Sequence, residues 1–305
     1  MPENEFKRPN RHTIRSYEAL TYFIIERELI RRRKEAGEGE PWTNDPILAK
    51  YRFCNVRRRD DRVSRWLIKN LYQGATVETF ITAAVSRLIN WPLTLAALRV
   101  NGVIPCTSQS FNREDFIKYL AWYKSRHDKT FTGAYMIFPT NKFAPKEVGI
   151  ADSLRSIINN HEIIEKAIRS NMLINTAAEL QKCDGIGAFM AGQIVADLTY
   201  QPGVLDKADD LYLWAPLGPG SQKGLNVLKD NTPYKGWTSH EFNTELLYIL
   251  KRWITPNLSF PDYISMTLHD VQNCMCEFSK YSKVILQLGA PRSLYKSEAH
   301  LYRAI

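Results

Sequence analysis

Apolar residues recur at helical spacing along most of this 305-residue chain. In segment 14–36, Leu20, Phe23, Ile24 and Leu29 fall on one side of a helix. The same spacing predicts further helices within 58–71, 76–100, 112–125, 149–200, 240–253 and 267–285. Pro92 is expected to break the third helical segment, and only 129–141 has the aromatic and β-branched density of an extended stretch. The chain is therefore predicted to be mostly α with little strand.

Glycine and proline are concentrated in 201–240, which is expected to form loops. No internal repeat or low-complexity linker marks a clear domain boundary. The domain boundary that fits the sequence best lies near 140–150. It divides the chain into an N-terminal helical region, 1–145, and a second helical region, 146–305. Together the two regions are expected to form one compact, two-lobed unit.

The composition excludes several classes of protein. Hydrophobic residues make up 44% of the chain, yet no apolar run is long enough for a membrane span, so no membrane partner is expected. The polar N-terminus lacks an apolar signal segment, which favours a cytoplasmic location. The five cysteines show no CxxC spacing, so reduced thiols are expected, with no metal and no cofactor.

The formal net charge of +9 favours a polyanionic partner, because each cation that neutralises a phosphate releases a counterion. General surface basicity is the alternative explanation. A more specific signal is the stretch "LQKCDGIGAFMAGQIVADLTY", 180–200, in which helical spacing stops at Gly-Ile-Gly and resumes at once. The hypothesis is a hairpin whose backbone amides face a DNA phosphate, with Lys182 beside Gly185, Ile186 and Gly187. A plain turn between two packed helices is the alternative.

The arrangement after this hairpin resembles that of the helix–hairpin–helix DNA glycosylases. In that superfamily a catalytic Asp follows the second glycine by about twenty residues, beyond a Gly/Pro loop, and here Asp206, Asp209 and Asp210 follow Pro202-Gly203. The resemblance implies a carboxylate that acts on a sugar or deprotonates a nucleophile. Helix capping is the alternative role for these aspartates. The Schiff-base lysine of the lyase members would fall at Phe189, so lyase activity is not expected.

A glycine-rich segment, "APLGPGSQKGL", suggests an anion cradle at 215–225. Gly218, Gly220 and Ser221 would offer backbone amides and a hydroxyl, and Lys223 would add one cation. The segment lacks the G-x-x-x-x-G-K-[ST] spacing, so ATP binding is not expected. A plain turn is the alternative.

Two further clusters combine cations with carboxylates. On a helix beginning near Arg58, Arg58 and Arg62 would share a face, as would Asp61 and Arg65, and could bind phosphate. In the second cluster, one stripe of a helix carries Asp270, Asn273 and Glu277. With Lys280 nearby, this stripe suits a polar pocket. A solvated salt-bridge helix and an ordinary surface are the respective alternatives.

Four motifs in order resemble the phage thymidine-hypermodification proteins known as α-glutamyl/putrescinyl thymine pyrophosphorylases, or amino acid:DNA transferases. They are "YRFCNVRRRDDRVSRWL", "CDGIGAFMAGQIVADLTY", "APLGPGSQKGLN" and "LHDVQNCMCEFSKY", and the resemblance runs over about 15–285. The region around Asn55, Arg58 and Asp61 is also similar to a module attached to 5-hydroxymethyluracil DNA kinases.

The resemblance implies a transferase that acts on double-stranded DNA containing a modified pyrimidine. It would replace the phosphate, or pyrophosphate, of 5-phosphomethyl-deoxyuridine with an amine or amino acid. The implied roles are phosphate neutralisation by Arg58, Arg62 and Lys223 and proton transfer by Asp61, Asp209, Asp210 or Glu277. Base flipping would bring the reacting carbon into a pocket, with Tyr212, Trp214 or Tyr281 stacked on the base. The alternatives are a glycosylase that excises a modified base from phage DNA and a module that only binds DNA.

Overall fold

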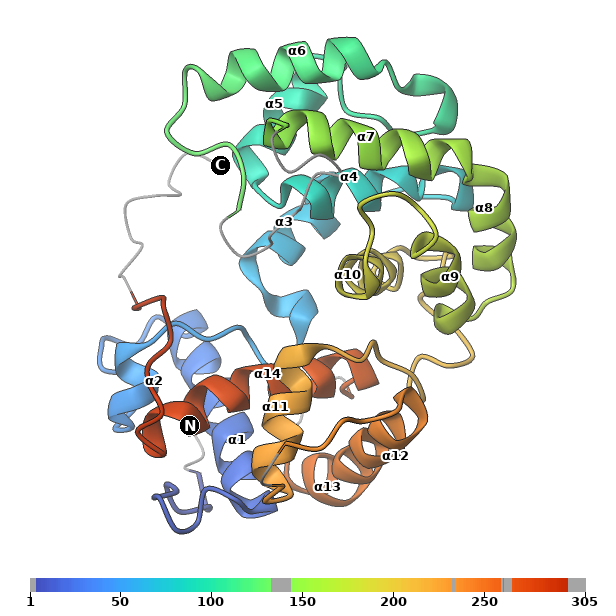
Figure 1. Ribbon diagram of the computed structural model, residues 1–305. Helices are drawn as coiled ribbons and strands as arrows, with labels where there is room; N and C mark the ends of the chain where they lie inside the picture. The colour runs from blue at the N-terminus through green and yellow to red at the C-terminus, as the bar shows by residue number, and fades with distance from the viewer. Residues whose placement is uncertain (1–3, 133–143, 232–233, 259, 261–264, 296–305) are drawn as a thin grey trace. The chain divides into compact units, whose positions relative to one another are not determined.

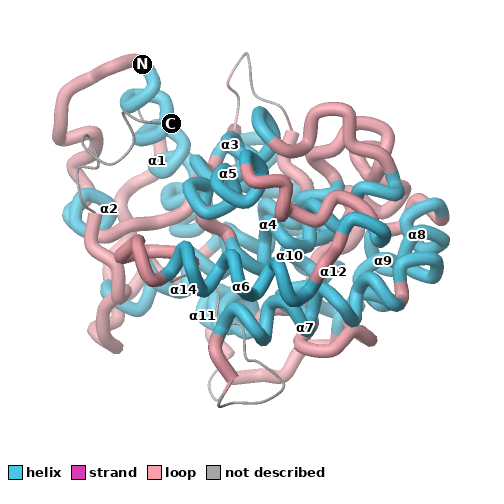
Figure 2. The backbone as a smooth tube through the Cα atoms, turned by 90° about the horizontal axis from the view of Figure 1, so that it is seen from above, coloured by secondary structure: helices cyan, strands magenta, loops and turns pink. Residues whose placement is uncertain are grey.

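The computed structural model describes residues 4–132, 144–231, 234–258, 260 and 265–295. The prediction of a mostly helical chain is confirmed, since these residues form helices joined by loops (Figure 2). Within the described part, the β-type pairing is one isolated bridge between Tyr51 and Leu294. Most of the stretch expected to be extended, 129–141, lies outside the described residues. No helix in the described part is long and apolar enough to cross a membrane.

The chain divides into two compact units. Unit 1 consists of two separate pieces, 1–61 and 212–305, whereas unit 2 is the continuous stretch 62–211. This division differs from the boundary expected at 145/146, which falls inside unit 2. A unit formed by two distant pieces of chain leaves no change of composition at its edges, so helical spacing alone does not reveal it.

Unit 1 contains two long helices, α1 (Tyr17–Glu35) and α14 (Leu268–Ile285). Its shorter elements are α2 (Pro46–Lys50), the 3₁₀ turn η1 (Arg58–Asp60), α11 (Pro219–Leu228), α12 (Ser239–Ile249), the π-helical turn η4 (Leu250–Ile254) and α13 (Thr255–Asn257). A capping box begins α14: the Thr267 hydroxyl accepts from the backbone of Asp270, and the Asp270 carboxylate accepts from the backbone of Thr267. Helix α11 lies along α14 (Figure 1).

The core of unit 1 is rich in aromatic rings. Phe23 of α1 contacts Phe278 and Tyr281 of α14 with ring centroids 5.8 and 5.0 Å apart. The hydroxyl of Tyr281 donates a 2.6 Å hydrogen bond to the buried carboxylate of Asp45, which also caps α2. These contacts join the N-terminal piece of unit 1 to its C-terminal helix, and they make Tyr281 a core residue.

In the described part of unit 2, residues 62–132 and 144–211, the regular elements are all helical. Its elements are α3 (Arg62–Asn70), the 3₁₀ turn η2 (Val77–Thr79), α4 (Ile81–Ile89), α5 (Pro92–Val100), the 3₁₀ turn η3 (Ser108–Ser110), α6 (Arg113–Lys124), α7 (Lys146–Asn159), α8 (His161–Arg169), α9 (Leu173–Leu180) and α10 (Ala188–Leu198). The predicted break at Pro92 is confirmed: α4 ends at Ile89, its C-cap Asn90 has a left-handed backbone, and Pro92 is the first residue of α5.

A buried ion pair stabilises the interior of unit 2. Arg87 of α4 is paired with Asp197 of α10, and both side chains are almost completely buried. The Arg87 guanidinium also donates to the Ser64 hydroxyl at 2.9 Å and to the Asn90 amide oxygen at 3.0 Å. These additional bonds satisfy the donors, as a buried charge requires.

Candidate active site

Residues 53–61, here called the 53–61 turn, lie against one stripe of α14 within unit 1. The backbone N–H of Arg58 donates a 2.8 Å hydrogen bond to Oδ1 of Asp270, 212 residues away in the sequence. At the other end of the turn, the backbone N–H of Cys54 donates to Oε2 of Glu277 at 3.2 Å. The two carboxylates are two helical turns apart on α14, so they hold both ends of the turn.

The middle of the turn is held by the same helix. Nδ2 of Asn273 donates to the backbone oxygen of Asn55 at 3.3 Å, and Sγ of Cys274 lies 3.5 Å from the backbone oxygen of Val56. The arginine-rich motif and the polar stripe of α14 were expected separately. The fold brings them together into one polar cluster.

Asp61 closes the turn. Its carboxylate accepts a 2.9 Å hydrogen bond from the backbone N–H of Asn55, and its own N–H donates to the carbonyl of Arg58 at 3.1 Å. The backbone of Asp61 is extended, with φ −63° and ψ 140°, so η1 ends there and α3 begins separately at Arg62. The expectation of one helix from Arg58 is wrong, and with it the helical face shared by Arg58 and Arg62. Asp61 lies just before the first residue of α3, and Arg65 lies within that helix.

The surroundings of Asp61 alter its acidity. Burial raises the pKa of its carboxyl to about 6, although the Asn55 N–H and the Arg58 guanidinium both act in the opposite direction. The nearby carboxylate of Glu277 adds to the upward shift. A carboxyl with this pKa can accept a proton near neutral pH, which suits a general base.

Cations lie on both sides of the cluster. Nζ of Lys280 donates to Oε1 of Glu277 at 2.5 Å, one helical turn further along α14. Burial is the largest single influence and lowers the pKa of the Lys280 ammonium, but the charge and hydrogen bond of Glu277, together with Cys54 and Cys276, shift the pKa upward overall, so the charge is retained. The buried Arg27 of α1 donates to the backbone oxygens of Phe53 and Cys54 at 2.9 and 2.7 Å. The cluster therefore combines fixed positive charge with one carboxyl that titrates near pH 6.

The glycine-rich segment does not form the expected loop. Gly218 is the N-cap of α11, and Gly220, Ser221 and Lys223 all lie within that helix. The hydroxyl of Ser221 is fully buried, donates to the carbonyl of Gly218 at 2.9 Å, and accepts from the Gln272 amide of α14. Lys223 is exposed.

Close packing of helices explains these glycines. A Cβ on Gly220 would collide with the Cys276 side chain, and one on Gly224 would collide with the backbone carbonyl of Met275. The glycines therefore let α11 approach α14 closely, and an anion cradle is not needed to explain them.

In unit 2, the turn at 181–187 joins α9 to α10. Gly185 has a left-handed backbone, φ +74°, and a Cβ there would collide with the Ser153 hydroxyl of α7. The N–H of Asp184 donates to the Ser156 hydroxyl of the same helix at 2.9 Å. Gly187 is the N-cap of α10, and no atom lies within 4 Å of the place a Cβ would take. The turn thus packs against α7 on one side and is open at Gly187.

Two other residues of this turn were expected to touch DNA. Ile186 is buried, with 3% of its surface exposed, so only its backbone is available to a ligand. Lys182 is exposed and its Nζ forms a 2.7 Å ion pair with Glu179 of α9. An ion pair this exposed contributes little to stability and can exchange for a phosphate.

The aspartates after the hairpin form hydrogen bonds that fasten their loop. The carboxylate of Asp210 is buried and accepts from the backbone N–H groups of Leu173 and Ile174 at 2.7 and 3.0 Å, which caps the start of α9. Asp209 accepts from the Asn171 amide at 2.9 Å, and Asp206 accepts from the N–H of Gly203 at 2.9 Å. Asp210 therefore matches the capping alternative, whereas Asp206 and Asp209 bond to loop residues.

Among the described residues, no three His, Cys, Asp or Glu side chains form a group that could hold a metal ion. Burial raises the pKa of the Cys274 and Cys276 thiols, so both stay protonated near neutral pH.

Comparison with known families accounts for most of the chain. Residues 15–288 match the model of the helical domain of 5-hmdU DNA kinase. The chain belongs to this family. It is also similar to a protein of Bacillus phage SP10 named 5-hmdU DNA kinase, with 27% identity over 235 residues. That similarity covers 68% of this chain but 35% of the phage protein, so the chain spans about a third of the relative's length. No solved structure matches the chain.

The helical-domain match includes every element that forms the cluster. Both the 53–61 turn and α14 lie within residues 15–288, as does all of unit 2. The cluster is thus part of the family's helical domain and not of a segment outside it.

Sequence reasoning missed two contributors to the cluster. Arg27 lies between Glu26 and Glu28 in the charged second half of α1, so the sequence pattern does not reveal that it is buried. Cys54 contributes its backbone N–H, which no side-chain pattern reveals.

Proposed function

We propose that this chain is a DNA base-modifying transferase in the hypermodification of phage thymidine. It would replace the phosphate, or pyrophosphate, on the C5 methylene of 5-phosphomethyl-deoxyuridine in double-stranded DNA with an amine or amino acid. The family and the phage SP10 relative support a role in the same kind of DNA modification. A kinase acting on 5-hydroxymethyldeoxyuridine would produce the phosphorylated base that this transferase consumes.

A kinase reaction by this chain has less support. The chain spans about a third of the kinase relative, and no Gly-Lys dipeptide occurs anywhere in its sequence, so a G-x-x-x-x-G-K-[ST] loop is absent from it.

The observation that carries the proposal is the placement of Asp61 beside the charges of Arg58 and Glu277. In the proposed step, the amine nitrogen forms a bond to the C5 methylene carbon while the C–O bond to phosphate breaks. Phosphate leaves with the bonding electron pair, and Arg58 stabilises its charge. Asp61 accepts the proton that the attacking nitrogen loses. Glu277 positions Lys280, whose ammonium adds a second cation for the leaving group or the carboxylate of an amino acid.

DNA contact is assigned to the hairpin of unit 2. Gly187 is open to solvent at the start of α10, where first-turn N–H groups and the helix dipole favour a phosphate. A flipped base would expose its C5 substituent. Tyr212 is 45% exposed and available for stacking, unlike Tyr281.

A glycosylase that excises a modified base is the alternative, and it depends on the Asp206–Asp210 loop. The loop-fastening hydrogen bonds of Asp209 and Asp210 support the transferase in preference.

The test is incubation of the protein with duplex DNA carrying 5-phosphomethyl-deoxyuridine, with and without a mixture of amino acids and polyamines. Mass spectrometry of the nucleosides should show a gain that depends on the amine, with phosphate released and no abasic sites. The Arg58→Ala variant should lose this gain, whereas Arg59→Ala, which removes an exposed cation from the same turn, should keep it. Abasic sites formed without any amine would replace the transferase with the glycosylase.

A further inference from the structure

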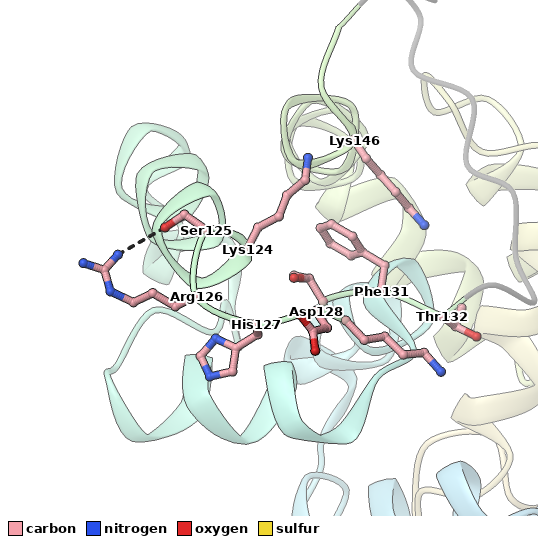
Figure 3. Close-up of a pocket in the computed structure, with 10 residues that line it drawn as sticks. Lys124, Ser125, Arg126, His127, Asp128, Phe131, Thr132 and Lys146 are labelled. Atoms are coloured by element: carbon pink, nitrogen blue, oxygen red, sulfur yellow. Dashed lines mark hydrogen bonds between the residues drawn. The ribbon is translucent and has the colours of Figure 1, made fainter.

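We propose that unit 2 binds the sugar–phosphate backbone of DNA in a basic pocket beside the C-terminus of α6 and the N-terminus of α7. The pocket is open, has a volume of about 660 Å³, and is lined by residues 124–132 together with Lys146 (Figure 3). It shares no residue with the 53–61 turn or with the hairpin at 181–187. The proposal uses the proposed function only to choose DNA as the polyanion.

Positive charge dominates the lining. Lys124, Arg126, Lys129 and Lys146 all border the pocket, and Asp128 is the single acidic residue among the described residues that line it. Lys124 is partly neutralised, because its Nζ forms a 3.1 Å ion pair with Glu147 of α7. The other three cations each lie over an aromatic ring.

For Arg126 and Lys146, the ring holds the cation without neutralising it. The Arg126 guanidinium lies 4.7 Å from the centre of the Trp122 ring, and Nζ of Lys146 lies 4.8 Å from that of Phe131. Nζ of Lys129 is 3.7 Å from the centre of the Trp91 ring. A carboxylate partner would cancel the charge, whereas an aromatic face orients the cation and leaves its net charge available to a phosphate.

Two positive charges lie close together in the pocket, which supports an anion as its ligand. The Phe131 ring lies between the side chains of Lys124 and Lys146 (Figure 3). Burial, together with the charge of Lys124, lowers the pKa of the Lys146 ammonium. A bound phosphate would stabilise both ammonium groups and relieve this repulsion.

The form of the pocket favours a strand over a small free anion. Its volume admits a ligand of nucleotide size, and one side is open, so a chain can pass through it. Cations interleaved with aromatic rings are typical of surfaces that follow a nucleic-acid backbone. Trp122, which is 47% exposed, extends this surface beyond the pocket.

The test compares the double variant Arg126→Ala/Lys146→Ala with a matched pair, Lys118→Ala/Lys166→Ala, which removes two exposed cations from elsewhere in unit 2. Binding of short unmodified DNA, duplex and single-stranded, is measured by fluorescence anisotropy over a range of salt. The pocket variant should bind roughly ten times more weakly near 100 mM salt. For duplex DNA, the slope of log binding constant against log salt concentration should become shallower by about 1 to 2. The matched pair should change affinity by less than about twofold.

Equal affinity and slope in the two double variants would overturn the proposal. Circular dichroism checks the fold, and Arg126→Gln/Lys146→Gln replaces the alanine variant if that one unfolds. Inorganic phosphate and a mononucleotide serve as competitors: displacement of DNA by either at micromolar concentration would instead assign the pocket to a small free anion. Because the DNA carries no modified base, this result does not depend on transfer chemistry. A protein that binds in this way but transfers no amine would contradict only the proposed function.

Discussion

The backbone N–H of Arg58 anchors the 53–61 turn to Asp270, 212 residues away in the sequence. The donor is a main-chain N–H, so any residue other than proline at position 58 can form this bond and hold the turn when the guanidinium is removed. The charge of that guanidinium acts on both Asp61 and Asp270. The role of the side chain in chemistry and the role of the backbone in folding can therefore be measured separately.

Arg58→Ala should lower the amine-transfer rate constant, because the transition state loses roughly 2–4 kcal/mol of stabilisation. This is the usual cost of removing a preorganised charge-stabilising group. Arg58→Lys should restore only part of the rate, because an ammonium lacks the bidentate fork of a guanidinium. Single-turnover kinetics on 5-phosphomethyl-deoxyuridine DNA measure the effect, with Arg59→Ala as the control. Full activity of the alanine variant would exclude Arg58 from the chemistry.

Asp270→Ala should destabilise unit 1 by about 2–4 kcal/mol. The substitution leaves the buried N–H of Arg58 without its acceptor, at a cost of roughly 1–3 kcal/mol, and removes the capping box of α14, worth about 1 kcal/mol. Urea unfolding followed by circular dichroism gives the change. Glu162→Ala, which removes an exposed acid from the first turn of α8, should stay within about 0.5 kcal/mol of the parent. A similar small effect at Asp270 would show that the anchor is dispensable.

Asp61 should make the free energy of unfolding fall as pH rises, which is the reverse of the usual effect of a carboxylate. Its pKa is about 6 in the folded protein against 3.8 for the ordinary group, so between these values the folded state binds the proton more tightly. The stabilising contribution is present below about pH 4 and is lost as pH rises through about 6. Asp61→Asn, which has no charge to bury, should gain roughly 1–3 kcal/mol relative to the parent between about pH 4 and pH 7.

The measurement is urea unfolding of both proteins across this pH range, with exposed Asp115→Asn as the control. In activity assays the parent should lose rate as pH falls through about 6, because protonated Asp61 no longer accepts a proton. A constant stability difference between Asp61→Asn and the parent at every pH would contradict the raised pKa.

Gly187→Ala should weaken DNA binding without changing the fold. Nothing lies within 4 Å of the added Cβ and the backbone of Gly187 is not left-handed, so the substitution is tolerated in the free protein. A phosphate approaching the start of α10 would meet the new methyl group. Affinity for DNA of any sequence should fall, since phosphate contacts position the protein without reading bases. Gly236→Ala, equally unobstructed, is the control, and equal affinity of the two variants would argue against the hairpin contact.

Gly224→Ala tests the role now given to the glycine-rich segment. The new Cβ would overlap the backbone carbonyl of Met275, so α11 must move away from α14, at a cost of about 1–3 kcal/mol. Thermal unfolding should show this loss. Lys223→Ala, which removes the exposed cation of the same helix, should leave stability unchanged. If the segment were an anion cradle, Lys223→Ala should instead reduce activity more than Gly224→Ala does.

Helical spacing was sufficient for the class of fold, because helices such as α6 and α8 bury an apolar stripe that is visible locally. It failed at 219–228, where the glycine and proline content indicated a loop. The reason is tertiary: Gly220 and Gly224 are tolerated in a helix because close packing on α14 compensates for their weak helical propensity.

The candidate site was only half visible in the sequence. The spacing of Asp270, Asn273 and Glu277 placed them on one stripe, but their partners in the 53–61 turn lie more than 200 residues away. The same limit applies to Asp61, whose extended backbone depends on the Asn55 N–H and not on the helical propensity of its neighbours.

The interrupted course of unit 1 sets an order for its assembly as the chain is synthesised. Residues 62–211 leave the ribosome as one continuous stretch and can fold as a unit, whereas α1 and the 53–61 turn must wait for α14. During that interval the apolar side chains of α1, such as Phe23, have no aromatic partners from α14. We therefore expect the nascent chain to need a chaperone until translation has passed residue 285, and a message truncated before α14 to yield a folded unit 2 beside an N-terminal segment that aggregates or is degraded.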